Sequence, residues 1–429
     1  MSLNNVLVFA YYFPPMGLSG VQRVAKFMKY LPNHGWRPHV IATGPTAYYA
    51  HDEALLEELV SRDIVIHRTT GTDPNSRLAS KGTVRMPHEF IRKGLNRLSS
   101  TIFIPDNKRG WASQALRTAR ELVKETSFDC IWVSGPPFSS MMAAAKLSVE
   151  TGIPLVVDYR DLWYGNQFSF YPTPLHAHLH KQYEYDVLTH AAKVVVTNRR
   201  IKERLLATYP QLDVHDIVII PHGYDADDHT AALERPPMIK DTSAMSLTYT
   251  GIFYEMVTPK YFLEAVRRFR NERPDARIQL HFAGLLRDQH KRRIKRLGLQ
   301  EITTDHGYCS HPDTVRLLLD SDVLWMMVGN GKNADTISSG KLYEYFGTRK
   351  PLLVSVPQGA LRRDAERYGA ARLTDPADVP AITACIAELY DAWAKRTLPT
   401  PDPAVVAQFD RRTLTGELAK VLATSIRIQ

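Results

Sequence analysis

The feature that most constrains this chain is a repeated alternation of short apolar runs with longer segments of helical spacing. The apolar runs of the first half lie at 6–9, 39–42, 64–67, 130–133, 155–157, 194–196 and 217–220. Because these runs are continuously apolar, they are typical of strands that helices cover on both faces. Segments with helical spacing separate them, as at 21–31 and 113–125. The first half therefore predicts a doubly wound parallel sheet.

The alternation restarts after a polar, proline-bearing stretch at 225–243, which has the composition of a linker. Apolar runs follow at 247–249, 278–283, 323–327 and 352–354, with helical segments at 259–271, 312–320, 341–346 and 379–395. Since 429 residues are too many for one ordinary core, we expect an α/β protein of two doubly wound, Rossmann-like domains facing each other across a cleft. The expected N-terminal domain covers 1–228 and the C-terminal one 229–409, and a helix within 410–429 is expected to pack on the first.

Charge and cysteine content narrow the function. The 54 Lys and Arg outnumber the 45 Asp and Glu by nine, which suggests an anionic partner. Three widely spaced cysteines predict neither a disulfide framework nor a thiolate metal site, so we expect a cytoplasmic protein. No window contains the roughly 18 apolar residues that a membrane span needs.

Glycines mark the first connection between an apolar run and a helix. Gly17, Ser19 and Gly20 directly precede the helical segment at 21–31. Glycine lets the backbone approach a ligand, and the free amides of a helix N-terminus favour an anion such as phosphate. A turn whose glycines only relieve steric crowding explains the pattern equally well.

A second helix entry carries a cation and a carboxylate. Ser339, Gly340 and Lys341 suit a diphosphate, and Glu344, three residues after the lysine, could accept hydrogen bonds from ribose hydroxyls. The alternative is an ordinary capped helix with a solvated Lys–Glu pair.

Charged side chains follow two neighbouring apolar runs. Asp158, Arg160 and Asp161 come at the end of the run at 155–157, and Ser134 and Gly135 follow the run at 130–133. A parallel sheet delivers groups at this edge to a ligand, so they are candidates for acid–base chemistry. An ion-paired loop is the competing interpretation.

Five segments, in order, together resemble the family 4 retaining glycosyltransferases of GT-B fold, especially the bacterial branch of surface polysaccharide assembly. They are PPMGLSGVQR (14–23), SGPP (134–137), DYRDLW (158–163), PHGYD (221–225) and SGKLYEY (339–345). The resemblance implies a nucleotide-sugar donor held mainly by the C-terminal domain, an acceptor approaching from the N-terminal domain, and no cofactor or essential metal.

The resemblance also assigns roles. It implies that Glu344 binds the ribose, and that Lys341 stabilises the departing phosphate as a catalytic residue. Asp161 or Asp158 would orient the acceptor or take its proton. The remaining donor-binding residues it implies are Gly17, Ser19, Gly20, Gly251, Lys260, Ser339 and Gly340, and the acceptor-side residues are Arg160, Ser134 and Gly135.

The sequence departs from the family pattern at two positions. Thr336 stands where the family commonly has a glutamate, eight residues before Glu344, and Arg160 stands where many members have a histidine. A noncatalytic nucleotide-binding subunit and a nucleotide-sugar epimerase therefore remain as alternatives to a retaining glycosyltransferase that acts on a glycan or lipid-linked acceptor. A nucleic-acid partner is not expected, because no recognisable basic and aromatic module is present.

A basic amphipathic segment at 81–109 suggests that the protein rests on an anionic membrane, at the inner face. A solvated helix that packs on the domain by its apolar side is the alternative. The segment contains Glu89 and Asp106 against seven basic residues, which are Lys81, Arg85, Arg92, Lys93, Arg97, Lys108 and Arg109.

Overall fold

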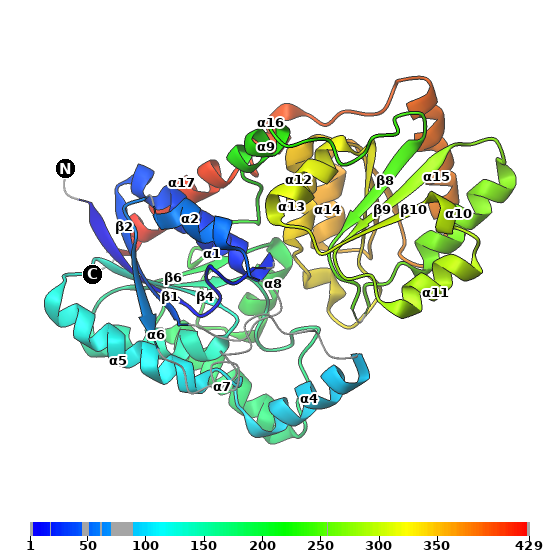
Figure 1. Cartoon of the computed structure of the whole chain (residues 1–429). Helices are drawn as coiled ribbons and strands as arrows, with labels where there is room; N and C mark the ends of the chain where they lie inside the picture. The colour runs from blue at the N-terminus through cyan, green and yellow to red at the C-terminus, as the bar shows by residue number, and fades with distance from the viewer. Residues whose placement is uncertain are drawn as a thin grey trace. The chain divides into compact units, whose positions relative to one another are not determined.

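The computed structural model describes residues 3–17, 19–44, 51–60, 62–69, 89–254 and 256–426, with the side chains of 19, 89–93, 95 and 96 left undescribed. Contacts divide the chain into two units, Met1–His222 with Arg411–Gln429, and Gly223–Asp410. The limits expected from the sequence were 228 and 409. We call these units the N-terminal and C-terminal domains and describe each by itself (Figure 1).

The N-terminal domain contains, within its described residues, a seven-stranded parallel sheet of order β3-β2-β1-β4-β5-β6-β7. Its strands are β1 (Asn4–Ala10), β2 (Trp36–Thr43), β3 (Val65–Thr69), β4 (Cys130–Gly135), β5 (Leu155–Tyr159), β6 (Lys193–Val196) and β7 (Ile217–Ile219). Its helices are α1 (Ser19–Tyr30), η1 (Leu31–His34), α2 (Glu53–Val60), α4 (Glu89–Ile102), α5 (Arg109–Glu125), α6 (Phe138–Thr151), α7 (Pro174–Thr189), α8 (Arg199–Thr208) and α17 (Arg411–Ile426).

Helices cover both faces of this sheet. Helices α1 and α17 pack together on one face, and α5 and α6 pack together on the other (Figure 1). The central strands are fully enclosed, as their apolar sequences require, and Leu418 and Leu422 of α17 have no exposed surface. Helix α17, which follows the second domain in the chain, therefore completes the core of the first domain.

The C-terminal domain repeats the plan with a six-stranded parallel sheet, counted over the described residues, of order β10-β9-β8-β11-β12-β13. Its strands are β8 (Met245–Thr250), β9 (Ile278–Ala283), β10 (Thr303–Gly307), β11 (Val323–Met327), β12 (Leu352–Ser355) and β13 (Ala371–Thr374). Its helices are α9 (Ala226–Leu233), α10 (Lys260–Glu272), α11 (Asp288–Arg296), η3 (Gln300–Ile302), α12 (His311–Asp320), η4 (Ala334–Thr336), α13 (Gly340–Thr348), α14 (Ala360–Tyr368), α15 (Val379–Ala394) and α16 (Pro403–Ala407).

The strand orders place a reversal of winding in each sheet. The reversal lies between β1 and β4 in the first domain and between β8 and β11 in the second. In such sheets, ligands bind outside the carboxyl ends of the strands at this point. The connections that follow these four strands are therefore where a site is expected in each domain.

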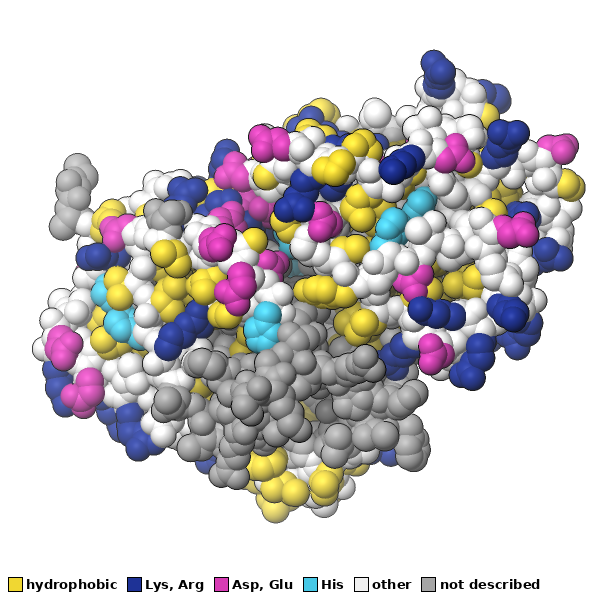
Figure 2. Space-filling model, in the orientation of Figure 1, with side chains coloured by type: hydrophobic (Ala, Val, Ile, Leu, Met, Phe, Trp, Pro, Cys, Tyr) yellow, Lys and Arg dark blue, Asp and Glu magenta, His cyan; other side chains and the backbone are white. Residues whose placement is uncertain are grey.

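Surface charge is dispersed on the face of the molecule shown in Figure 2. Among the residues described on this face, Lys and Arg side chains lie scattered among acidic ones and do not form one continuous stripe. The described helices include none that is long and apolar enough to cross a membrane.

A buried ion pair joins the parts of the N-terminal domain. Arg23 of α1 and Asp158 of β5 have no exposed side-chain surface, and Arg23 Nη2 lies 2.7 Å from Asp158 Oδ1. Ser134 of β4 donates to Asp158 Oδ2 at 2.6 Å. Arg23 also donates to the carbonyl oxygens of Ile220 and Pro221, at 2.9 and 2.8 Å. The pair thus connects α1, two central strands and the segment after β7.

We expect Asp158→Asn to lower the free energy of unfolding by about 3–5 kcal/mol, because it leaves the Arg23 guanidinium buried without a countercharge. Urea denaturation followed by circular dichroism measures the loss. Glu150→Gln is the matched control, since it breaks the half-exposed pair with Arg120 and should change stability little. Equal effects of the two substitutions would contradict the structural role of the buried pair.

Candidate functional site

The connection after β1 lies at the reversal point of the first sheet and leads directly into α1. Gly17 is buried, and Ser19 is the first residue of the helix. Gly20 lies beside Arg160, since a Cβ there would be 3.4 Å from Arg160 Nη1, an ordinary contact distance. The three residues predicted to face a phosphate therefore stand at a helix N-terminus, the geometry that favours anions.

Arg160 holds the connections of this edge together. It is 6% exposed and donates hydrogen bonds to the carbonyl oxygens of Gly20 and Pro136. Burial lowers the pKa of its guanidinium, and the nearby Asp161 and Asp158 carboxylates oppose this shift. Arg160, which the sequence predicts on the acceptor side, thus links the first turn of α1 to the turn after β4.

Ser134 and Gly135 take part in the same packing. The Ser134 hydroxyl donates a hydrogen bond to the Asp158 carboxylate. The Gly135 carbonyl accepts a hydrogen bond from the backbone amide of Arg160 at 3.1 Å. A Cβ at Gly135 would lie 2.5 Å from the Met141 side chain, so glycine fits closely here. Both residues contribute to the shape of the site edge, and their predicted contact with an acceptor stays a prediction.

The two candidate carboxylates after β5 have different surroundings. Asp158 is enclosed by Arg23 and Ser134, which favours a structural role over the catalytic one predicted from the sequence. Asp161 is only partly buried, and none of the residues that the structure describes donates a hydrogen bond to its carboxylate. Burial raises the pKa of Asp161, while Arg160 opposes the shift. Asp161 is therefore the carboxylate available to a ligand.

In the C-terminal domain, Lys341 lies in the first turn of α13 and reaches toward β8. Its Nζ is 3.9 Å from the centre of the Tyr249 ring. The φ of +119° at Gly251 favours glycine, and a Cβ there would lie 2.6 Å from this Nζ and displace the ammonium group. Burial lowers the pKa of Lys341 to about 7, against the opposing effect of Glu344. A cation that is costly to bury is thus held at a helix N-terminus.

The start of α13 offers polar groups without internal partners. Ser339 is the N-cap residue, yet its side chain makes no capping hydrogen bond. The Ser338 hydroxyl is buried with no hydrogen-bond partner in the described part of the chain. Together with the backbone amides from Gly340 onward, these groups can bind phosphate oxygens.

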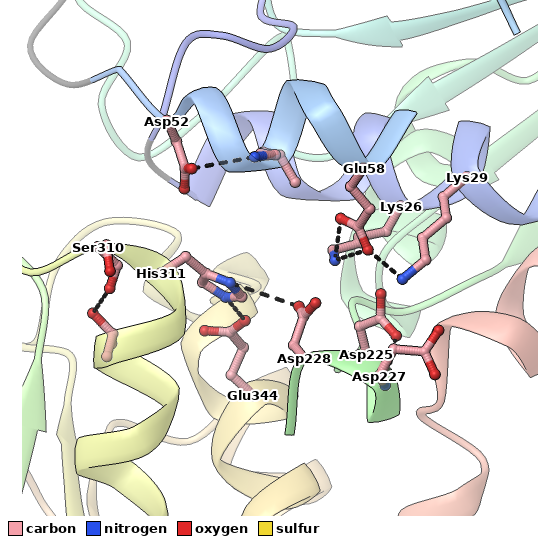
Figure 3. Close-up of polar contacts among 12 residues, drawn as sticks. Lys26, Lys29, Asp52, Glu58, Asp225, Asp227, Asp228, Ser310, His311 and Glu344 are labelled. Carbon is pink, nitrogen blue, oxygen red and sulfur yellow. Dashed lines mark hydrogen bonds and ion pairs between the residues drawn. The ribbon is translucent and has the colours of Figure 1, made fainter. Parts of the chain in front are cut away.

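Glu344 lies one turn after Lys341 and is held by a neighbouring helix (Figure 3). His311, the first residue of α12, places its Nε2 2.8 Å from Glu344 Oε1. Its Nδ1 lies 3.6 Å from the Asp228 carboxylate of α9. The Glu344 side chain keeps 28% exposure, so part of it can meet a ligand while the imidazole fixes its orientation.

His311 was not predicted as a site residue from the sequence. The Ser310 cap of α12 is visible in the sequence, and it implies that His311 opens a helix. Nothing local connects His311 with Glu344, because 33 residues separate them and only the packing of α12 against α13 brings them together.

The structure also places Lys260 and Thr336, two further positions that the sequence analysis named. Lys260 begins α10, and its Nζ lies 4.8 Å from the centre of the neighbouring Tyr261 ring, with no described contact to Lys341. Thr336, at the position of the family glutamate, is buried in η4 and donates to the Asn333 carbonyl at 2.8 Å. The donor-binding role of Lys260 stays a prediction.

The structure describes only part of the basic segment at 81–109. Lys81 and Arg85 lie outside the described residues, as do the side chains of Arg92 and Lys93. Lys108 is 5% exposed, with its Nζ 4.7 Å from the centre of the Tyr11 ring. The prediction that Lys108 contributes to a membrane-facing surface is therefore wrong, because its charge points into the domain.

Comparison with known proteins identifies related families and folds. Residues 19–228 match the family model described as Glycosyltransferase Family 4. No curated protein matches the sequence. Together with the fold, the family match supports a glycosyltransferase.

Solved structures resemble the whole chain. A glycosyltransferase from Rickettsia africae has 16% identity and a TM-score of 0.65, with 100% of both chains covered. Sucrose-phosphate synthase from Thermosynechococcus elongatus has 13% identity and a TM-score of 0.65, covering 99% of this chain and 100% of that one. Anabaena HepE in complex with UDP and glucose has 13% identity and a TM-score of 0.63, covering 98% and 99%. The fold is accordingly that of GT-B glycosyltransferases, with two parallel-sheet α/β domains.

We expect the affinity for a diphosphate such as UDP to fall as the pH rises above 7. A bound diphosphate favours the ammonium form of Lys341, whose pKa is about 7 in the unliganded protein, so each further pH unit weakens binding by up to about tenfold. Calorimetric titration between pH 7 and 9 tests this, because the phosphates are already ionised there.

Lys341→Met should weaken binding and abolish its pH dependence. Lys332→Met is the control, since it removes an exposed lysine of the same domain and should leave the profile unchanged. Wild-type affinity that stays constant from pH 7 to 9 would refute the assignment.

Proposed function

We propose that this protein is a nucleotide-sugar-dependent glycosyltransferase. The observation that carries the proposal is the arrangement at the start of α13, where Lys341 stands beside Gly251 and Glu344 follows one turn later. This arrangement offers a cation and helix amides to a diphosphate and a carboxylate to a ribose. The family match of residues 19–228 and the GT-B fold support the same conclusion.

We infer that the reaction retains the configuration of the transferred sugar. The bond between the anomeric carbon and the diphosphate oxygen breaks, and its electrons remain on the phosphate, where Lys341 and the helix amides stabilise the charge. The acceptor hydroxyl forms the new bond on the same face and passes its proton to a phosphate oxygen. Because these groups supply the positive charge, we propose that no metal or cofactor is required, so that EDTA should leave turnover unchanged.

Neighbouring structures suggest where to begin the search for a donor. HepE has been solved with UDP and with UDP-glucose, which makes uridine nucleotides the first candidates. We propose that Gly17 and Gly20 complete the diphosphate site and that Asp161 orients the acceptor, which is a glycan or a lipid-linked glycan in surface polysaccharide synthesis. The three unpaired cysteines support action in the cytoplasm.

A thermal-shift screen of nucleotide sugars tests the donor class, since a ligand that binds the folded state raises its melting temperature. We expect one nucleotide sugar to raise the melting temperature and to be consumed when an acceptor is present. Binding without turnover across an acceptor panel would favour the noncatalytic subunit. Conversion of the donor into an isomer without an acceptor would favour an epimerase.

Glu344→Ala should weaken binding of the nucleoside diphosphate found in the screen by about 10- to 100-fold. A hydrogen bond to a charged group contributes about 1.5–3 kcal/mol, and 1.4 kcal/mol corresponds to a factor of ten. The sharper readout is discrimination: the wild type should prefer the ribonucleotide over its deoxyribose counterpart, and the variant should lose that preference.

His311→Ala should reduce the same discrimination by a smaller factor, because the carboxylate remains but is no longer held. Glu388→Ala, which breaks only the surface pair with Arg372, is the control. Unchanged affinity of the Glu344 variant in calorimetry would remove its ribose assignment.

A further inference from the structure

A cavity of about 280 Å³ lies in the N-terminal domain at the end of β5. It is close to the size of the smallest ligand pockets. Four separate segments of the chain contribute to its wall, from α4, the start of α6, the connection after β5 and α7. The lining residues used below are Asp161, Phe138, Trp163, Phe168, Phe170 and Tyr171.

The inner wall of the cavity is aromatic and fixed. The Phe138 and Trp163 rings are nearly parallel, with their centres 4.8 Å apart. Trp163 is 1% exposed, and its Nε1 donates to His180 Nδ1 at 3.1 Å. The next amide, of Tyr164, donates to the buried Glu184 carboxylate at 2.8 Å. A wall held in this way is preorganised, which lowers the entropic cost of binding.

The polar group of the cavity is the Asp161 carboxylate. It accepts no hydrogen bond from the residues that the structure describes, so its oxygens are available to a ligand. A ligand that satisfies this carboxylate must bring hydroxyl or amide donors, while the aromatic wall requires an apolar face. A sugar ring combines hydroxyl edges with a face of C–H groups and meets both requirements.

The segments that line the cavity also carry exposed apolar side chains. Phe168 and Phe170 line the cavity and are 44% and 42% exposed. The neighbouring helix α4 adds Leu98 and Ile102, at 58% and 61%. We call the apolar rim the set of Leu98, Ile102, Phe103, Phe168, Phe170 and Leu175.

Two contacts join the segments that carry the apolar rim. The Arg97 guanidinium of α4 lies 5.4 Å from the centre of the Phe170 ring. At the start of α7, His176 Nε2 lies 3.2 Å from the Thr101 carbonyl of α4. Figure 2 shows hydrophobic side chains at the lower edge of the molecule, where Figure 1 places α4 and α7. Large exposed apolar patches mark interaction sites, and a soluble sugar would not require one.

Described basic side chains adjoin the apolar rim. The exposed Arg97 of α4 lies beside Phe170, and the exposed Arg109, the first residue of α5, donates to the carbonyl of Ile104, the neighbour of Phe103. Arginine beside an apolar surface suits an anionic lipid headgroup or a lipid phosphate. We propose, resting on the glycosyltransferase function proposed above, that this cavity binds the sugar of a membrane-borne glycolipid acceptor whose apolar part lies on the apolar rim.

Alkyl glycosides are suitable probes. Dodecyl glycosides, used below their critical micelle concentration, are compared with methyl glycosides of the same sugars, and Trp163 provides a fluorescence signal from the cavity wall. We expect at least tenfold tighter binding of the dodecyl form, because burial of two methylenes already accounts for that factor. Asp161→Asn should weaken binding of both forms.

Leu175→Ser should reduce binding of the dodecyl form and leave the methyl form unchanged. Leu233→Ser is the matched control, since Leu175 and Leu233 are 62% and 61% exposed and Leu233 belongs to the other domain. Flotation with phosphatidylglycerol vesicles should show the same difference between the two variants.

Equal binding of methyl and dodecyl forms would overturn the lipid part of the proposal in favour of a soluble glycan. A dimer in light scattering that Leu175→Ser dissociates would assign the apolar rim to a second copy. No glycoside binding, with UDP binding intact, would overturn the cavity assignment alone, whereas loss of both would contradict the proposed function.

Discussion

The arrangement of the N-terminal domain depends on the buried pair between Arg23 and Asp158. Neither charge can be solvated, so each is stable only when the other is in place, together with the Ser134 hydroxyl and the carbonyls after β7. The pair fixes α1 against the sheet, and α1 directly follows the glycine-rich connection after β1. Arg160 then links the first turn of α1 to the turn after β4. Two buried arginines thus place the backbone amides that the proposed function uses.

Much of the fold could be predicted from the sequence, because strands covered on both faces are continuously apolar. The strands that were missed, β10 and β13, show the limit of this signal. They are the two edge strands of the second sheet, and β10, with the sequence TTDHG, contains no buried residue. An edge strand is stabilised by pairing with its neighbour, so its own residues need not be apolar.

The site could be predicted only where its residues are close together in sequence. The Lys341 and Glu344 pair lies on one helix, and its position follows from helical spacing. The separate roles of Asp158 and Asp161 could not be predicted, because they depend on Arg23, whose contact with β5 spans 135 residues. The contact of His311 with Glu344 and the aromatic cavity likewise arise from packing between distant segments.

The return of α17 to the first domain has a consequence for synthesis on the ribosome. Residues 223–410 are contiguous, so the second domain can complete its core while the chain is still growing. The first domain cannot complete its core at that stage, because Leu418 and Leu422 fill its interior and emerge only after the second domain. N-terminal domains usually fold first during synthesis, but here the second domain can complete its core before the first domain does. Until α17 docks, the first domain exposes the apolar surface that this helix covers, and such transiently exposed surface favours aggregation.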